Sequence, residues 1–258
     1  MCEHGYKKAT SDHCVFVKRF ANNDFIIPLY VDDMLIVGKD ISMINRLKKQ
    51  LSDSFAMKDM RVAKKILGIR IMSDRQEKKV WLSQEHFFKS VLQRFQMQNA
   101  KAVNTPLATH FKLRAKQSPS NETEKSDMQR VPYAYVVGSL MHAMVCTRPD
   151  IAHVVSTVSR FLSNLGREHW NAVRWILRYL RGTTCLKLCF GGNMPTLMGY
   201  TDCDIGGDID SRRSASGYVI KFAGGVVTWQ SKLQKCVALS TTEAKFIALQ
   251  KHARSFLG

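Results

Sequence analysis

The sequence lacks the long apolar runs and the secretion signal that would place it in or across a membrane. Hydrophobic residues make up 45% of the chain, yet no run reaches the ~18 residues that a membrane-spanning helix requires. The first residues carry lysines and a glutamate in place of the apolar core of a signal peptide. We therefore expect an intracellular protein with no membrane partner.

Cysteines are too irregular in number and position to form a disulfide framework. There are 7 of them, an odd number, scattered without regular spacing, which is typical of reduced thiols in an intracellular protein. Internal repeats and low-complexity tracts are also missing, which excludes a repeat array. With 258 residues, the chain is long enough for one large domain or two smaller ones with a real core.

Acidic residues are scarce relative to basic ones. The chain has 39 Lys and Arg against 21 Asp and Glu, which gives a formal net charge of +18 and an isoelectric point near 9.8. This surplus says little about the fold, but it favours polyanionic partners, nucleic acid first. Charge alone leaves open a merely soluble basic protein and a membrane-surface binder.

Residues 25–38 carry two apolar, strand-length runs on either side of two adjacent acids, Asp32 and Asp33. Burial of both runs would hold the two carboxylates at a tight turn. Adjacent carboxylates repel each other unless water solvates them or a cation bridges them. The pair therefore either stays solvated in the turn or binds a divalent metal such as Mg²⁺, which prefers carboxylate oxygens together with substrate phosphates.

The remaining apolar periodicity predicts a mixture of strands and helices, and hence the α+β class. Strands are expected at 13–20, 65–72 and 80–82, and helices at 41–55 and 83–97. Residues 112–130 have few large apolar residues and many charges, as a linker does. Further helices are expected at 133–146, 149–163 and 167–181, then strands ending at 202 and at 217–222 and 226–231, and a last helix to about 256.

The helix expected at 167–181 carries a basic stripe beside its apolar one. The apolar stripe consists of Trp170, Val173, Leu177 and Leu180, and the basic stripe of Arg167, Arg174, Arg178 and Arg181. At ~100° per residue the four arginines fall within a narrow arc. A solvated charged face explains them, but the absence of acids opposite them favours a surface that follows nucleic-acid phosphates.

Motifs along essentially the whole chain resemble those of copia-type LTR-retrotransposon reverse transcriptases, plant elements most closely. They include Tyr30-Val31-Asp32-Asp33, Phe55-Ala56-Met57-Lys58-Asp59-Met60, Leu82-Ser83-Gln84-Glu85, Asn104-Thr105-Pro106 and Thr147-Arg148-Pro149-Asp150. The resemblance implies a fragment of a retrotransposon Pol polyprotein, an RNA-directed DNA polymerase with ribonuclease H. Its implied partners are RNA, DNA, RNA–DNA hybrid and the rest of the polyprotein. Asp32 and Asp33 would hold the cofactor, Mg²⁺, at the polymerase site.

The C-terminal motifs resemble the start of the copia-type ribonuclease H domain. They are Gly199–Asp204, Ser214–Tyr218 and Ala238–Ala244. The resemblance implies that Asp202 and Glu243 bind catalytic Mg²⁺, where metal-activated water attacks an RNA phosphodiester. Glu243 also ends a capping box that begins at Ser240, and Asp202 could equally be a turn acid at a strand end. Three further acids are expected to lie in a loop: Asp204, Asp208 and Asp210.

The resemblance also predicts how the chain is divided. The expected parts are 1–111, the C-terminal part of the palm and thumb; 112–130, a charged linker; 131–194, a helical connection region; and 195–258, the N-terminal part of an incomplete ribonuclease H-like mixed sheet. The family's further catalytic acids fall beyond both ends, and Lys245 replaces a usual Glu, which weakens cation binding. We therefore expect the isolated chain to be inactive. A non-enzymatic, basic nucleic-acid-binding remnant is the alternative.

Overall fold

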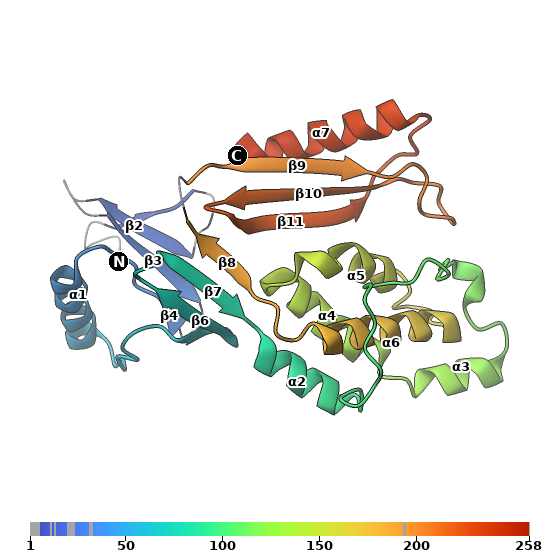
Figure 1. Ribbon diagram of the computed structural model, residues 1–258, viewed down its shortest axis with the longest axis horizontal. Coiled ribbons are helices and arrows are strands. Elements are labelled where there is room, and N and C mark those ends of the chain that lie inside the picture. Colours follow the sequence, from blue (N-terminus) through green and yellow to red (C-terminus); the bar gives the residue numbers. More distant parts are fainter. Residues whose placement is uncertain are drawn as a thin grey trace. The chain divides into compact units, whose positions relative to one another are not determined.

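The computed structural model describes residues 6–10, 12, 14–19, 24–30, 33–192 and 195–257. The chain divides into two compact units, Met1–Ile66 and Leu67–Leu257. Helices and antiparallel sheets occur together (Figure 1), which confirms the expected α+β class. None of the helices in these ranges has the length and apolar content needed to cross a bilayer.

The first unit is a sheet with one helix packed on it. Its strands are β1 (Lys7–Lys8), β2 (Val15–Arg19), β3 (Asp24–Tyr30) and β4 (Asp33–Met34), paired antiparallel in chain order. Helix α1 (Ile41–Ser54) starts after Asp40, whose carboxylate accepts the backbone N–H groups of Ser42 and Met43. Its apolar face buries Leu47 and Leu51 against Ile27, and the short strand β5 (Lys65–Ile66) ends this unit.

The second unit opens with strands β6 (Ile69–Asp74) and β7 (Lys79–Ser83), to which β8 (Leu188–Gly191) adds from far along the chain. The single strand predicted over 65–72 is interrupted because Leu67 and Gly68 both adopt positive φ, 49° and 79°. Leu67 is a costly residue for that conformation, so the periodicity of its neighbours gave no sign of the turn.

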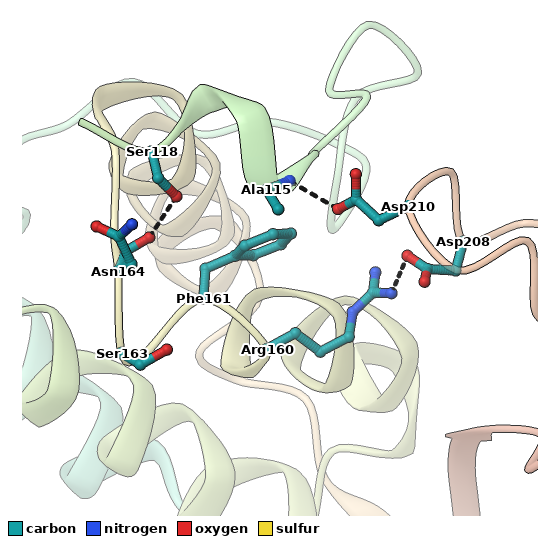
Figure 2. A pocket seen from close by; sticks show the side chains of 8 residues that line it. All are labelled: Ala115, Ser118, Arg160, Phe161, Ser163, Asn164, Asp208 and Asp210. Carbon is teal, nitrogen blue, oxygen red and sulfur yellow. Dashed lines mark hydrogen bonds and ion pairs between the residues drawn. The ribbon is translucent and has the colours of Figure 1, made fainter. Parts of the chain in front are cut away.

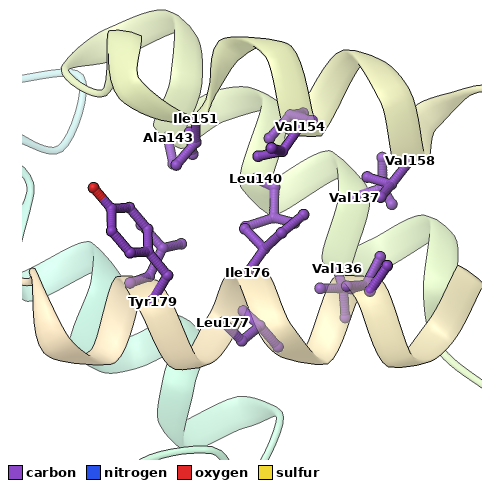
Figure 3. Packing of buried hydrophobic residues seen from close by; sticks show 14 of the residues in the cluster. Val136, Val137, Leu140, Ala143, Ile151, Val154, Val158, Ile176, Leu177 and Tyr179 are labelled. Atoms are coloured by element: carbon purple, nitrogen blue, oxygen red, sulfur yellow. The ribbon is translucent and has the colours of Figure 1, made fainter. Parts of the chain in front are cut away.

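Helices form the main core of the second unit. They are α2 (Glu85–Arg94), α4 (Tyr133–Cys146), η3 (Pro149–Ile151), α5 (Ala152–Ser159) and α6 (Arg167–Gly182). Figure 3 shows side chains of α4, α5 and α6 pointing toward one another, with Leu140 and Ile176 between the helices. The helix predicted over 149–163 starts instead with a 3₁₀ turn and ends at Ser159.

Residues 112–130, expected to be a linker, contain the 3₁₀ turn η2 (Ala115–Gln117) and helix α3 (Glu122–Gln129). Leu113 is buried in the helical core, so part of this segment packs with the second unit. Helix α3 buries none of its own residues and is capped locally by the side chain of Asn121. A short polar helix of this kind has no apolar stripe, which is why periodicity missed it.

The C-terminal part is a three-stranded meander covered by one helix. Strands β9 (Met198–Cys203), β10 (Ala215–Phe222) and β11 (Gly225–Leu233) lie in the order β11-β10-β9, all antiparallel. The hairpin between the last two turns through Ala223 and Gly224, both at positive φ. Helix α7 (Thr241–Leu257) packs on β9 and β10 (Figure 1), and it buries Ala244, Ala248 and His252.

Candidate nucleic-acid and metal sites

Asp33 lies at the end of the β3–β4 hairpin in the first unit. Tyr30 pairs with Asp33, which leaves only two residues between the paired strand ends. The pairing brings the two strand ends together as the predicted hairpin requires, and the two intervening residues lie outside the described part of the chain. Asp33 is exposed, whereas Ile27 in the middle of β3 is fully buried and anchors the hairpin. Asp32 lies outside the described residues.

Asp202 and Glu243 are both exposed, and each makes a local hydrogen bond. Asp202 Oδ1 accepts the N–H of Cys203 at 2.9 Å near the end of β9. Glu243 Oε2 accepts the N–H of Leu239 at 2.8 Å, while its own N–H donates to Ser240 Oγ at 3.1 Å. The capping role left open by the sequence is therefore present at the start of α7.

Helix α7 runs opposite to β9, so the helix start with Glu243 lies toward the C-terminal end of the strand that carries Asp202 (Figure 1). Lys245 shares this end. Burial raises the pKa of the Cys203 thiol and Asp202 adds to that, whereas the charge of Lys245 opposes it. Over the ranges that the structure describes, no three His, Cys, Asp or Glu side chains gather closely enough to hold a metal.

The loop between β9 and β10 uses its acids for structure. Asp208 is buried and forms an ion pair with Arg160 at the end of α5. Burial would raise the pKa of Asp208, but hydrogen bonds from Ser211 and the charge of Arg160 outweigh it and lower the pKa. Asp210 Oδ2 accepts the N–H of Ala115 at 2.6 Å.

A cavity of about 290 Å³ lies beside these two acids. Figure 2 shows the ring of Phe161 between the Ala115–Asp210 and Arg160–Asp208 contacts. Asp204 is committed in the same loop, since its Oδ1 accepts the N–H of Ala215 at 2.6 Å. The three acids therefore lie in a loop, as the sequence predicts, and their hydrogen bonds and ion pair join this loop to neighbouring segments.

The basic stripe of α6 divides into two pairs. Arg178 Nε donates to the carbonyl of Lys101 at 2.7 Å, and Arg181 Nε donates to the carbonyl of Gln98 at 3.1 Å. These two arginines hold the segment 98–105 against the helix. Arg167 and Arg174 are exposed. In the described part of the chain, none of the four forms an ion pair with a carboxylate.

Trp175 reinforces the contact of α6 with the segment 98–105. Its Nε1 donates to the carbonyl of Thr105 at 3.0 Å, and the guanidinium of Arg178 stacks 4.9 Å from the centre of its ring. A cation over an indole face is attracted by the ring quadrupole. This contact holds the side chain of Arg178 against Trp175 and toward the segment 98–105.

Arg148 is the most buried charged side chain in the described part of the chain, and the sequence predicted no role for it beyond its place in the Thr147–Asp150 motif. It is 2% exposed and donates from Nε and Nη2 to Asp150, and from Nη1 and Nη2 to Thr183. Burial would raise the pKa of Asp150, but Arg148 and Tyr179 outweigh it and lower the pKa. Its position directly before Pro149, at the start of a 3₁₀ turn, was the available signal.

The sequence family described as Reverse transcriptase (RNA-dependent DNA polymerase) matches residues 1–109. Over 253 residues, 98% of the chain, the sequence is 60% identical to the retrovirus-related Pol polyprotein from transposon TNT 1-94 of Nicotiana tabacum. It is 35% identical over 94% of its length to the corresponding polyprotein from transposon RE1 of Arabidopsis thaliana.

The putative transposon Ty5-1 protein YCL074W of Saccharomyces cerevisiae is 30% identical over 94% of the chain. The chain spans 77% of that yeast protein, but only 19% of the tobacco polyprotein and 16% of the Arabidopsis one. No solved structure matches the chain.

Proposed function

Because the chain belongs to the retrovirus-related Pol polyproteins of transposons and carries a reverse transcriptase segment, we propose that it contributes to an RNA-directed DNA polymerase with an attached ribonuclease H. The observation that carries the proposal is the Tyr30–Asp33 pairing within the matched segment, which presents an exposed carboxylate at a hairpin end. In this proposal the palm and thumb include residues 1–111, and a linker at 112–130 joins them to a connection region at 131–194. The nuclease domain begins with residues 195–258.

At the polymerase site, Asp32 and Asp33 would hold Mg²⁺. Bound Mg²⁺ stabilises the attacking and leaving oxygens of phosphoryl transfer. The fit rests on the donor type, since carboxylate oxygens suit Mg²⁺, and on the exposure of Asp33. Strand β3 is anchored by the buried side chain of Ile27 and pairs with β4, so the two strands would hold the acids in place.

At the nuclease site, Asp202 and Glu243 would hold Mg²⁺. Each commits one oxygen to a local N–H group, and each is exposed. Mg²⁺ is commonly held by one or two carboxylates together with substrate phosphates, which fits a pair of this kind. Lys245 works against the same cation because its charge acts at this strand end.

Arg167 and Arg174 would follow the nucleic-acid backbone on α6. They are exposed, and the chain's net charge of +18 favours association with polyanions. Phosphate contacts of this kind are independent of base sequence and weaken with salt. The expected ligands are RNA, DNA and RNA–DNA hybrid.

A second candidate function is non-enzymatic binding of nucleic acid. The cap formed by Glu243 and the nearby Lys245 favour it, because both reduce the capacity of this end of α7 to bind a cation. Under this candidate the arginine surface remains useful while the acids serve only the fold.

One set of measurements on the purified chain tests both candidates. We expect salt-dependent binding to an RNA–DNA hybrid, with no Mg²⁺-dependent primer extension or hybrid cleavage by the isolated chain. In the hybrid complex, Mn²⁺ as a paramagnetic substitute should broaden the amide signals of Asp33 and Met34, and D32N/D33N should abolish this. Broadening at Cys203 should disappear in D202N/E243Q in the same way.

Three other results would contradict one or both of these candidate functions. If Mn²⁺ broadens neither site, the metal roles are wrong and the non-enzymatic candidate stands. Primer extension that D32N/D33N abolishes would contradict the expected inactivity of the isolated chain. Failure to bind the hybrid even at low salt would contradict both candidates.

A further inference from the structure

Two tracts of the chain that contain no acidic residue meet along helix α6. Neither 86–121 nor 169–201 includes an Asp or a Glu. The carbonyls of Gln98, Lys101 and Thr105 accept hydrogen bonds from side chains of α6 that lie progressively nearer the start of the helix. The first tract therefore runs antiparallel to α6 here, and the two together form one surface.

Cationic side chains are exposed on this surface. Lys112 and Arg174 are both exposed, and neither forms an ion pair in the part of the chain that the structure describes. The acids Glu168 and Asp210 lie close to His169 at the start of the helix, so the surface begins beyond them, at Arg174. Because no carboxylate from either tract neutralises these charges, the surface favours an anionic ligand.

His110 presents an aromatic ring on the same surface. The residue is exposed, and the centre of its ring lies 4.3 Å from that of Phe111 and 5.8 Å from that of Trp175, to which it is nearly perpendicular at 89°. Its backbone lies in a tight turn, where the N–H of Phe111 donates to the carbonyl of Ala108 at 3.1 Å and that of Lys112 to the carbonyl of His110 at 2.9 Å. The ring is therefore held by aromatic contacts while it remains accessible to solvent.

The ring and the cations together match an unpaired strand of nucleic acid. Lys112 follows the ring by two residues, and Arg174 directly precedes Trp175, which contacts the ring. In single-strand binding, phosphates pair with cations of this kind while a base stacks on an aromatic side chain. In a duplex the faces of each base are covered by its neighbours, so only an unpaired base is available for stacking on a protein ring.

We propose that this surface binds a single strand of RNA or DNA, with one base stacked on His110 and the neighbouring phosphates on Lys112 and Arg174. Phe111 and Trp175 act as positioning residues, because they hold the ring of His110. The proposal rests on the nucleic-acid binding proposed above for α6 and specifies the form of nucleic acid that the helix receives. Stacking and phosphate pairing do not use the 2′-OH, so RNA and DNA should bind alike.

The test compares two single strands that carry the same number of phosphates. One is labelled oligo(U), and the other has the same length but abasic sites in place of the bases. Fluorescence anisotropy should show that oligo(U) binds about fivefold tighter or more, because stacking contributes only where a base is present. H110A should abolish this difference without changing the affinity for the abasic strand. H110F keeps an aromatic ring and should retain the difference.

Two further variants separate stacking from charge. H86A alters another exposed histidine of the same acid-free tract and should leave both affinities unchanged. K112Q/R174Q should weaken both strands equally and reduce the slope of log affinity against log salt by about 1.4, or about 0.7 per phosphate contact with a single strand. Oligo(dT) should give the same results as oligo(U), and thermal melts show whether each variant is folded.

An RNA–DNA hybrid separates this proposal from the function proposed above. Its bases are paired, so H110A should leave the affinity for the hybrid unchanged. Equal binding of oligo(U) and the abasic strand, or an equal loss in H110F and H110A, would overturn the single-strand proposal even though the hybrid still binds. If the hybrid and both single strands fail to bind at low salt, the nucleic-acid role of α6 is wrong as well.

Discussion

Arg148 is the residue whose charge is most fully removed from water. A buried guanidinium is tolerated only when its donors are satisfied. Asp150 and Thr183 receive its hydrogen bonds, and the rings of Phe88 and Tyr179 lie 5.4 and 5.5 Å from its Cζ. Tyr179 in turn donates to Asp150 at 2.7 Å. The arginine thus joins α2, η3 and the end of α6.

Removing this charge should be destabilising. R148M removes the hydrogen bonds from the buried guanidinium to Asp150 and Thr183 and leaves the partly exposed carboxylate of Asp150 without its counter-ion, so the free energy of unfolding should fall by about 1–3 kcal/mol. The control R174M alters an exposed arginine and should stay within about 0.5 kcal/mol. Urea denaturation measures both. A loss below about 1 kcal/mol in R148M would show that the network is redundant.

His169 gives stability a pH dependence of defined sign. Its Nδ1 accepts the N–H of Gly166 at 2.9 Å and its Nε2 lies 3.0 Å from the carbonyl of Arg114. Burial lowers its pKa, although the contact with Arg114 opposes this. The folded pKa is below the unfolded value of about 6.5. The neutral His169 therefore makes its full contribution to the free energy of unfolding above about pH 6.5. This contribution is lost as the pH falls toward the pKa of His169 in the folded state.

The free energy of unfolding should accordingly decrease between pH 7.5 and pH 5.5. Burial lowers the pKa of His153 and His252 in the same direction. H169F should be less stable at pH 7.5, because two hydrogen bonds are lost, yet it should depend less on pH. Denaturation at several pH values tests this. An unchanged slope in H169F would assign the pH dependence to the other histidines.

Among the elements, helix α6 depends on a glycine at its start. A Cβ on Gly166 would lie 1.9 Å from the carbonyl oxygen of Gln117. That oxygen belongs to the backbone of η2, which cannot move without disturbing the segment that buries Leu113. Close packing between η2 and the N-terminus of α6 therefore requires a residue without a side chain.

Two glycine substitutions should have opposite effects on stability. G166A should lower the free energy of unfolding by about 1–3 kcal/mol through overpacking. G138A lies within α4 with nothing within 4 Å of the added Cβ, and should raise it by about 0.5–1 kcal/mol. Thermal melts of both variants provide the measurement. A neutral G166A would mean that η2 shifts freely.

The arginines of α6 should separate into structural and binding pairs. R178Q/R181Q should speed hydrogen exchange across 98–105, because two contacts with that segment are lost. R167Q/R174Q should leave exchange unchanged. It should instead reduce the slope of log affinity for an RNA–DNA hybrid against log salt by about 1.8, or about 0.9 per phosphate contact. Equal effects of both pairs would contradict this division.

At the scale of the whole molecule, the two units differ in the size of their cores. The first buries a small cluster around Ile27, Leu47 and Leu51, and the second a large helical core. All four tryptophans, Trp81, Trp170, Trp175 and Trp229, belong to the second unit. Tryptophan fluorescence therefore reports on one unit, whereas circular dichroism reports on both.

Core truncations should act on one unit at a time. I27A should lower the first unit's stability by about 2–5 kcal/mol, which changes the dichroism curve but not the fluorescence midpoint. I176A, also fully buried, should shift the fluorescence midpoint. A common shift of both signals by I27A would show that the units unfold together.

The acidic hairpin and the stripes of α6 could be predicted because they depend on local pattern. The short apolar runs on both sides of Asp33 favour strands, and the 3.6-residue period places Val173 and Leu177 on one face of a helix. The cap at Ser240 and Glu243 is likewise local. Ser240 Oγ accepts the N–H of Glu243, while the Glu243 carboxylate accepts the N–H of Leu239 in place of that of Ser240. The metal roles of the acids stay predictions.

Other features required the tertiary structure, because they join segments far apart in the chain. The partners of Arg178 and Arg181 lie 77 and 83 residues away, so no helical pattern could identify them. The ion pair of Arg160 with Asp208 has the same origin.

The sequence by itself determined the α+β class, the reverse transcriptase family, most helices and strands, and the excess of positive charge. These follow from residue type and short-range spacing. The tertiary structure decided which polar groups are satisfied: it gave Arg148 a buried network and left His252 Nε2 without a partner. The physical reason is that burial and hydrogen bonding depend on which distant segments meet.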